Sequence, residues 1–257
     1  MKEFDELVDI MARLRADDGC PWDREQTHET LRPYFLEETY EALEAIDSGD
    51  AKKLCGELGD VVLQVVFHAQ IAAENGEYSA RDVLARINEK LRYRHPHVFG
   101  DASVRDSDEV VDNWEQLKLL EPEASHRVSA LDGVPDILPA LKRAFALQKK
   151  AAKVGFDWPD VEGSRAKVRE EEAELEEALA EGDRDRVADE FGDLLFALVN
   201  VARFYKIDPE DALRRTCDRF TGRFEKVEAG AAAEGHDLRD LDIEQLDALW
   251  EAAKKEE

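Results

Sequence analysis

The chain has 257 residues, with 35 Lys and Arg against 61 Asp and Glu, so its formal net charge at pH 7 is −26. A surface this acidic repels phosphate backbones and anionic lipid headgroups, which argues against a nucleic-acid binder and against docking on a membrane. The hydrophobic share of 43% is enough for the cores of one or two globular domains. An acidic protein can still bind a polyphosphate when divalent cations lie between the two.

Signals for targeting are absent from the sequence pattern. The first residues contain no basic segment leading into an apolar run, and the longest apolar runs, 61–67 and 194–199, are far shorter than the ~20 residues of a membrane helix. Cys20, Cys55 and Cys217 are widely spaced and form no CxxC pair, which suits a reducing compartment. We therefore expect a cytoplasmic protein with no membrane partner.

Apolar residues recur at helical spacing along almost the whole chain, and no segment shows a convincing period of two. In the first half, spacing and capping residues predict helices at about 7–14, 30–47, 50–75, 79–94 and 107–121, with a loop at 17–23. In the second half they predict helices at about 139–153, 163–181, 183–206, 208–229 and 242–254. The predicted fold is all-α.

The second half of the chain repeats the first. An EExxE motif, a fifteen-residue spacing and an ExxD motif recur 133 residues apart. The repeated acidic residues are Glu37, Glu38, Glu41, Glu57 and Asp60 in the first half, and Glu170, Glu171, Glu174, Glu190 and Asp193 in the second. We interpret the chain as two tandem helical domains, residues 1–122 and 137–257, joined by a linker at 123–136 that lacks periodicity.

The repeated carboxylates predict a metal site in each half. Positions three apart share a helix face, and a short turn makes the two acidic helices antiparallel neighbours, so four carboxylates converge in each domain. The converging sets are Glu38, Glu41, Glu57 and Asp60, and Glu171, Glu174, Glu190 and Asp193. Such carboxylates repel one another unless cations are present, and oxygen ligands without His or Cys favour Mg²⁺, with Mn²⁺ as a possible substitute.

Two alternatives were weighed from the same residues. One is an ordinary solvated acidic helix face in an acidic chain, against which the repetition argues. The other is a di-iron bundle, which needs Glu-x-x-His on facing helices. The tetrads Glu25–His28 and Glu123–His126 lie in a loop and in the linker and are not repeated. The spacing does not decide whether Glu170 or Glu171 is the ligand, because both share a face with Glu174.

The EExxE…ExxD pattern on paired helices resembles the all-α nucleoside triphosphate pyrophosphohydrolases, and its flanking segments resemble the MazG family over nearly the whole chain. These segments are GCPWD at 19–23, LEETYE at 36–41, GELGD at 56–60, RHPHVF at 94–99 and VGFDW at 154–158. The resemblance implies Mg²⁺-dependent hydrolysis of a broad range of NTPs and dNTPs to monophosphate and pyrophosphate, with water attacking the α-phosphorus. It also implies a homodimer and a role in nucleotide-pool housecleaning or stress control.

The resemblance also implies roles for individual residues. Glu171, Glu174, Glu190 and Asp193 correspond to the catalytic metal shell, and Glu170 to a supporting residue or a general base. Trp250 corresponds to a base contact, which suits loose specificity because a Trp face stacks on any base. The candidate substrate-binding residues are Lys167, Arg186, Asp189, Arg219, Arg223, Trp250 and, from the first half, Lys118.

The two halves differ at positions that bear on activity. Lys167 corresponds to Tyr34, which supplies no positive charge, and Asp189 corresponds to Gly56. We therefore expect the second domain to be the main catalytic centre and the first to be a secondary metal site. The alternative function is a non-catalytic nucleotide-sensing or protein-interaction module with a decayed site, against which the intact acidic motifs of both halves argue.

Overall fold

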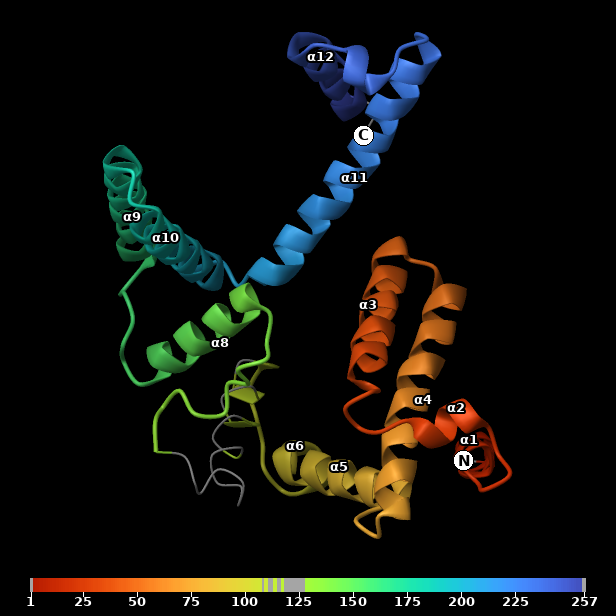
Figure 1. The fold of residues 1–257 in the computed structure, drawn as a ribbon. Coiled ribbons are helices and arrows are strands. Elements are labelled where there is room, and N and C mark those ends of the chain that lie inside the picture. The colour runs from red at the N-terminus through yellow and green to blue at the C-terminus, as the bar shows by residue number, and fades with distance from the viewer. Residues whose placement is uncertain (1, 108, 111–112, 115–116, 118–127, 256–257) are drawn as a thin grey trace. The chain divides into compact units, whose positions relative to one another are not determined.

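The fold is described from a computed structural model, which covers residues 2–107, 109–110, 113–114, 117 and 128–255 (Figure 1). Within these residues every regular element is helical, which confirms the predicted all-α fold. The chain divides into two compact units, Met1–Ser125 and His126–Glu257, and each is described by itself. The predicted linker at 123–136 lies partly outside the described residues, and its described part, 128–136, contains only turns and irregular backbone.

Unit 1 is built on a helix hairpin and the helices that pack against its second arm. Its elements are α1 (Lys2–Leu14), α2 (Pro21–Glu25), α3 (Arg32–Ser48), α4 (Ala51–Glu74), α5 (Ala80–Arg94) and α6 (Pro96–Phe99). Helices α3 and α4 form the hairpin, and α1 and α5 pack on α4. The core consists of Met11, Leu31, Val66, Phe67 and Ile71, which join α1, the start of α3 and the C-terminal half of α4.

One short helix in unit 1 replaces part of a predicted loop, and a second lies in a segment for which no element was predicted. Helix α2 occupies part of the segment predicted as a loop at 17–23, and α6 follows directly after α5. Both begin at a proline, Pro21 and Pro96. The fixed φ of proline suits the first helical position, where its missing N–H is not needed. The predicted helix at 107–121 falls on a segment of which more than half lies outside the described residues.

Helix α4 is the core helix of unit 1. By length and composition alone it would be long and apolar enough to cross a membrane. Its apolar residues Val66, Phe67 and Ile71 are buried in the core, and its first half carries Glu57 and Asp60. A core helix of a soluble protein passes the same test, so α4 is no evidence for a membrane span.

Unit 2 is built on the corresponding hairpin. Its elements are α8 (Ala140–Lys153), α9 (Val161–Glu181), α10 (Arg184–Phe204), α11 (Pro209–Ala233), the 3₁₀ helix η2 (Leu238–Asp240) and α12 (Ile243–Lys255). Helices α9 and α10 form the hairpin, α8 packs on α10, and α12 packs on α11. Helix α11 continues past its predicted end at 229, because Gly230 is followed by three alanines and the left-handed C-terminal glycine is Gly235.

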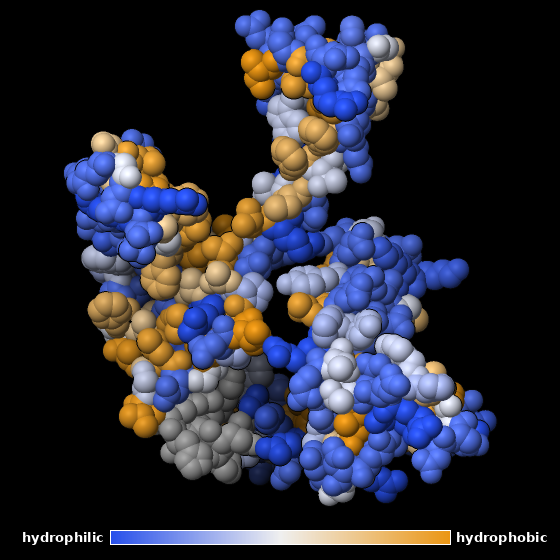
Figure 2. Space-filling view, in the orientation of Figure 1, coloured by the Kyte–Doolittle hydropathy of each residue, from blue (hydrophilic) through white to orange (hydrophobic). Residues whose placement is uncertain are grey.

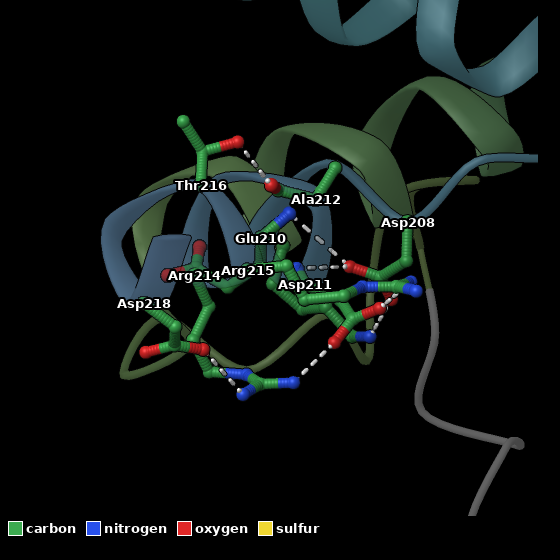
Figure 3. A network of polar contacts seen from close by, with 9 residues as sticks. Asp208, Glu210, Asp211, Ala212, Arg214, Arg215, Thr216 and Asp218 are labelled. Atoms are coloured by element: carbon green, nitrogen blue, oxygen red, sulfur yellow. Dashed lines mark hydrogen bonds and ion pairs between the residues drawn. The ribbon is translucent and has the colours of Figure 1, made fainter. Parts of the chain in front are cut away.

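The N-terminus of α11 is fixed by a network of acidic and basic side chains (Figure 3). Asp208 caps the helix by accepting hydrogen bonds from the backbone N–H groups of Glu210 and Asp211, and it also pairs with Lys142 of α8. Within the first turns, Asp211 pairs with Arg214 at 2.7 Å. The capping residue of α11 therefore also ties that helix to α8.

The two hairpins turn in the same way. Helix α3 ends at Gly49 with φ +68°, and α9 ends at Gly182 with φ +74°, a left-handed conformation that glycine adopts without steric cost. The next residue, Asp50 or Asp183, caps the second helix by accepting from the backbone N–H groups two and three residues later. The left-handed glycine and the capping aspartate together fix this short turn, and the turn sets the register in which each pair of acidic helices meets.

We predict that Asp183→Ala lowers the free energy of unfolding of unit 2 by ~1 kcal/mol, because two backbone N–H groups lose their acceptor. Urea denaturation followed by circular dichroism measures the change. Glu176→Ala, an exposed position in the middle of α9, is the matched control and should change stability by less than ~0.5 kcal/mol. Equal stability of the two variants would contradict the role of the cap.

Candidate metal and nucleotide site

Three carboxylates of unit 2 converge between the arms of its hairpin. Glu171 and Glu174 come from α9 and Glu190 comes from α10, and one oxygen of each lies within 4.8 Å of the other two. Glu171 is only 4% exposed, and the other two are half-buried. A hydrogen bond with Glu171, partial burial and the charges of Glu171 and Glu190 raise the pKa of Glu174. The neighbouring carboxylates therefore disfavour the ionised form of Glu174.

Lys167 lies one turn before these carboxylates and supplies part of that compensation. Its Nζ is 2.6 Å from Glu171 Oε1 and 2.8 Å from Glu170 Oε1. Hydrogen bonds to Glu170 and Glu171 raise the pKa of Lys167, so it stays protonated. Glu170 itself is exposed at the rim, whereas Glu171 is in the converging group. The geometry thus favours Glu171 over Glu170 as the ligand, the alternative that spacing left open.

Arg186 is the second cation beside the group. Its Nε is 3.6 Å from Glu190 Oε1, and its guanidinium is 2.5 Å from Glu181. The contact with Glu181, more than that with Glu190, raises the pKa of Arg186. Asp189 and Asp193, on the same helix, are exposed and lie outside the group of three. The roles predicted for these two aspartates remain predictions.

Unit 1 carries the corresponding group, Glu38, Glu41 and Glu57, with one oxygen of each again within 4.8 Å of the others. Burial, followed by the charges of Asp60 and Glu41, raises the pKa of Glu38. Asp60 is therefore within electrostatic reach of Glu38, although it is exposed and outside the group of three.

The surroundings of the unit 1 group differ from those in unit 2. A hydrogen bond from Gln64 partly stabilises the Glu38 carboxylate, and Gln64 stands where unit 2 has Ala197. At the position of Lys167, Tyr34 packs edge-on against Trp22 with ring centroids 5.8 Å apart. Lys53, which corresponds to Arg186, pairs with Glu44 at 2.9 Å. The first group therefore has no counterpart of the Lys167–Glu171 pair.

The remaining predicted substrate-binding residues of unit 2 form a second cluster, on α11 and α12. Arg223 Cζ lies 5.8 Å from the ring centroid of Trp250, and Phe220 packs 5.2 Å from the same ring. Arg219 is exposed, and its guanidinium donates to Thr216 Oγ1 at 2.8 Å. Arg223, Phe220 and Trp250 lie together where α11 packs on α12, whereas the carboxylate group lies between α9 and α10. Lys118 lies outside the described residues.

Two contacts near these sites were not foreseen from the sequence. In unit 1, Arg94 Cζ lies 5.6 Å from the ring centroid of Trp114, so the cation–π contact of Arg223 and Trp250 occurs in both halves. Also in unit 1, His28 of the loop before α3 and His68 of α4 share a hydrogen bond between their Nδ1 atoms at 2.7 Å. Isolated histidines in sequence gave no signal for this pairing.

The carboxylate groups fit a hard divalent cation by their chemistry. Three carboxylate oxygens and no nitrogen or sulfur ligand are the donor set that Mg²⁺, Mn²⁺ or Ca²⁺ prefers. Burial contributes most to the raised pKa of Glu38, and a hydrogen bond with Glu171 contributes most to that of Glu174. Charges of neighbouring carboxylates raise both pKa values further, and a bound cation would relieve that repulsion. Fold and site together define a duplicated all-α protein in which each helix hairpin brings together carboxylates that could hold a divalent cation.

Comparison with known proteins shows which family the chain matches. The model of the MazG nucleotide pyrophosphohydrolase domain matches the chain twice, at residues 26–99 and 161–228, and each match contains one hairpin. The nucleoside triphosphate pyrophosphohydrolase/pyrophosphatase MazG of Thermotoga maritima is 47% identical over 98% of this chain and 95% of that protein. The nucleoside triphosphate pyrophosphohydrolase of Escherichia coli K12 is 46% identical over 100% and 99%. YabN of Bacillus subtilis, an uncharacterized protein, is 50% identical over 99% of this chain and 52% of its own length.

The chain therefore belongs to the MazG family of nucleotide pyrophosphohydrolases. The two matches of the domain model confirm the tandem repeat inferred from the acidic motifs.

We predict that Glu174→Gln raises the melting temperature of the metal-free protein at about pH 7. The pKa of Glu174 is raised above its ordinary value of 4.5, so ionising it costs folding stability as the pH rises through that folded-state pKa. Glutamine removes the cost, and the gain should vanish at about pH 3, where the carboxyl is protonated in both states. Thermal unfolding in EDTA at both pH values measures this, and a loss of stability at about pH 7 would contradict the repulsion.

Proposed function

We propose that the chain hydrolyses nucleoside triphosphates, both NTPs and dNTPs, to nucleoside monophosphate and pyrophosphate in the presence of Mg²⁺. The observation that carries the proposal is the convergence of Glu171, Glu174 and Glu190 beside Lys167, inside a segment that matches the MazG domain model. Full-length relatives that bear the name nucleoside triphosphate pyrophosphohydrolase support the same activity.

Glu171, Glu174 and Glu190 would hold the cation, with Asp193 completing the set and Mn²⁺ as a possible substitute. When bound, a divalent cation offsets the charge of the triphosphate and makes the attack of water easier. Without such compensation a chain of net charge −26 would repel this substrate. The carboxylate group therefore accounts for how an acidic protein takes a polyanionic ligand.

Lys167 and Arg186 are proposed to contact the phosphates. In the structure both are paired with carboxylates of the group or its rim. We infer that a divalent cation bound to Glu171 and Glu190 would neutralise these carboxylates. Lys167 and Arg186 would then leave them and pair with phosphate oxygens. Glu170, which Lys167 holds at the rim, is the candidate base that accepts the proton of the water attacking the α-phosphorus.

The cluster of α11 and α12 would bind the nucleoside end of the substrate or its phosphates. Trp250 offers a ring for the base, and Arg219 and Arg223 offer positive charge; Asp189 and Lys118 remain further candidates. An indole face stacks on purines and pyrimidines alike, which fits a broad substrate range. We propose that another surface brings this cluster and the carboxylate group into one site.

A homodimer would supply such a surface. Three apolar positions are exposed at the same places in both hairpins, 133 residues apart: Ile46 and Leu179, Leu58 and Phe191, and Val62 and Leu195. Figure 2 shows apolar side chains at the surface over α10 and along α11. Large apolar residues exposed at repeated positions indicate an interaction face. We propose that this face of the hairpin pairs with a hairpin of a second copy of the chain.

The dimer predicts a change of mass on mutation. Leu195→Glu places a charge in the apolar face of α10 and should convert a dimer into a monomer in size-exclusion chromatography with light scattering. Leu213→Glu, which places the same charge at an exposed leucine of α11 outside the hairpin, is the control and should leave the dimer intact. A wild-type protein of monomeric mass would refute the dimer.

Unit 2 is proposed as the main catalytic centre, and unit 1 as a secondary metal site. The Lys167–Glu171 pair belongs to unit 2, whereas Tyr34 stands at the matching position of unit 1. A cytoplasmic role in nucleotide-pool housecleaning or stress control, without nucleic-acid or membrane partners, fits the acidic surface and the cysteine pattern.

We predict that Glu174→Gln lowers turnover at least ~100-fold, while Glu41→Gln, its counterpart in unit 1, lowers it less than ~5-fold. Each of the common NTPs and dNTPs is incubated with Mg²⁺, and products are separated by ion exchange. Monophosphate and pyrophosphate are expected. Diphosphate and phosphate, or no turnover of any substrate, would refute the proposed reaction, and equal losses in the two variants would refute the assignment to unit 2.

A further inference from the structure

A cavity of about 500 Å³ lies in unit 2, where the segment joining α8 to α9 folds against α8 and α10. Phe156, Trp158 and Phe196 form aromatic parts of its wall, and Leu147 adds an aliphatic part. Pockets for small organic ligands have this size, ~300–1,000 Å³, and this combination of apolar walls with a few polar groups. The lining residues are distinct from the carboxylate group and from the cluster of Trp250.

The wall of the cavity is held in place by its own contacts. Gly155 adopts φ +86° and lets the chain leave α8, after which the Phe156 N–H donates to Ala151 O at 3.1 Å. A Cβ at Gly163 would come within 2.6 Å of Trp158 Cδ2, so glycine there allows the indole to lie against the start of α9. Phe156 remains 83% exposed.

The polar groups of the cavity favour an uncharged ligand. Arg203 pairs with Asp157 and donates to Asn200 Oδ1 at 3.0 Å, so the positive charge that lines the cavity is already offset. Such a lining offers little attraction to a phosphate. It suits a neutral molecule with flat apolar faces and polar edges.

Gln148 supplies the specific polar contact. Its side chain is 8% exposed, and its Nε2 donates to the backbone oxygen of Phe196 at 2.8 Å, which fixes the orientation of the amide. Its Oε1 is buried and has no hydrogen-bond partner among the described residues. A buried acceptor without a partner is unfavourable, and an N–H donor in the adjacent cavity would satisfy it.

We propose that this cavity is a second ligand site that binds a neutral, planar nitrogen heterocycle of the size of a nucleobase, stacked on the aromatic wall and donating an N–H to Gln148 Oε1. Its lining includes none of the three converging glutamates, which separates it from the carboxylate group, although Phe196 lies three residues after Asp193 and shares a helix face with it. Phe196 follows Glu190 by six residues, which places it ~9 Å along the helix and about a third of a turn around it.

Calorimetric titration of the full chain with uncharged nucleosides tests the proposal. Adenosine, guanosine, cytidine and uridine are titrated in EDTA, so that no phosphate or metal contributes. We expect saturable binding of at least one nucleoside, weakened about tenfold or more by Phe156→Ala and by Gln148→Leu. Phe156 is exposed, so its variant keeps the fold. Trp22→Ala, at the position corresponding to Trp158 in unit 1, is the matched control and should bind as the wild type does.

Two measurements, the same titration and one kinetic assay, can contradict the proposed second ligand site. No saturable binding of any of the four nucleosides, or equal weakening by Trp22→Ala, would overturn the site. Affinity should be unchanged in Glu174→Gln, which makes the result independent of whether the chain hydrolyses NTPs. In the hydrolysis assay, a linear rise of apparent KM with nucleoside concentration would place the ring in the substrate site and overturn the separation; an unchanged apparent KM supports it.

Discussion

The structure depends on holding three glutamates together against their mutual repulsion. In unit 2 the hairpin turn at Gly182 and Asp183 fixes the register in which Glu171, Glu174 and Glu190 face one another within 4.8 Å. Apolar packing and helix capping maintain that register, and Lys167 offsets one of the charges. The remaining repulsion would give the proposed site its affinity for a divalent cation, because binding the cation would remove a cost imposed by folding.

Duplication places this arrangement in the chain twice, but with different surroundings. Both copies retain the converging glutamates, the glycine–aspartate turn and the Arg–Trp contact of the later helices. The lysine paired with the buried glutamate is specific to unit 2, whereas unit 1 has Tyr34 against Trp22 at that position and keeps Lys53 in the place of Arg186. A carboxylate group with one such cation fewer is less well equipped to orient phosphates, which is the physical basis for proposing the second unit as the main catalytic centre.

Much of the fold and part of the site could be predicted from the sequence. Period and capping gave the hairpin helices to within a few residues, because turns such as Ser48–Asp50 carry strong local signals. Spacing also brought Glu171, Glu174 and Glu190 together, since helix periodicity sets which side chains share a face. It could not show that Asp193 lies outside the group of three, because that depends on the rotation of α10 against α9. The partners of Lys167 and the pairing of His28 with His68 likewise depend on tertiary contacts.

The central claim is that each carboxylate group is a divalent-cation site, and that the group of unit 2 binds more effectively. Anomalous diffraction from crystals grown with Mn²⁺ tests it most directly, because manganese positions are located independently of any assumed chemistry. We predict a strong peak among Glu171, Glu174 and Glu190, and a peak of equal or lower occupancy among Glu38, Glu41 and Glu57. Manganese bound only elsewhere, with both groups empty at saturating metal, would contradict the account.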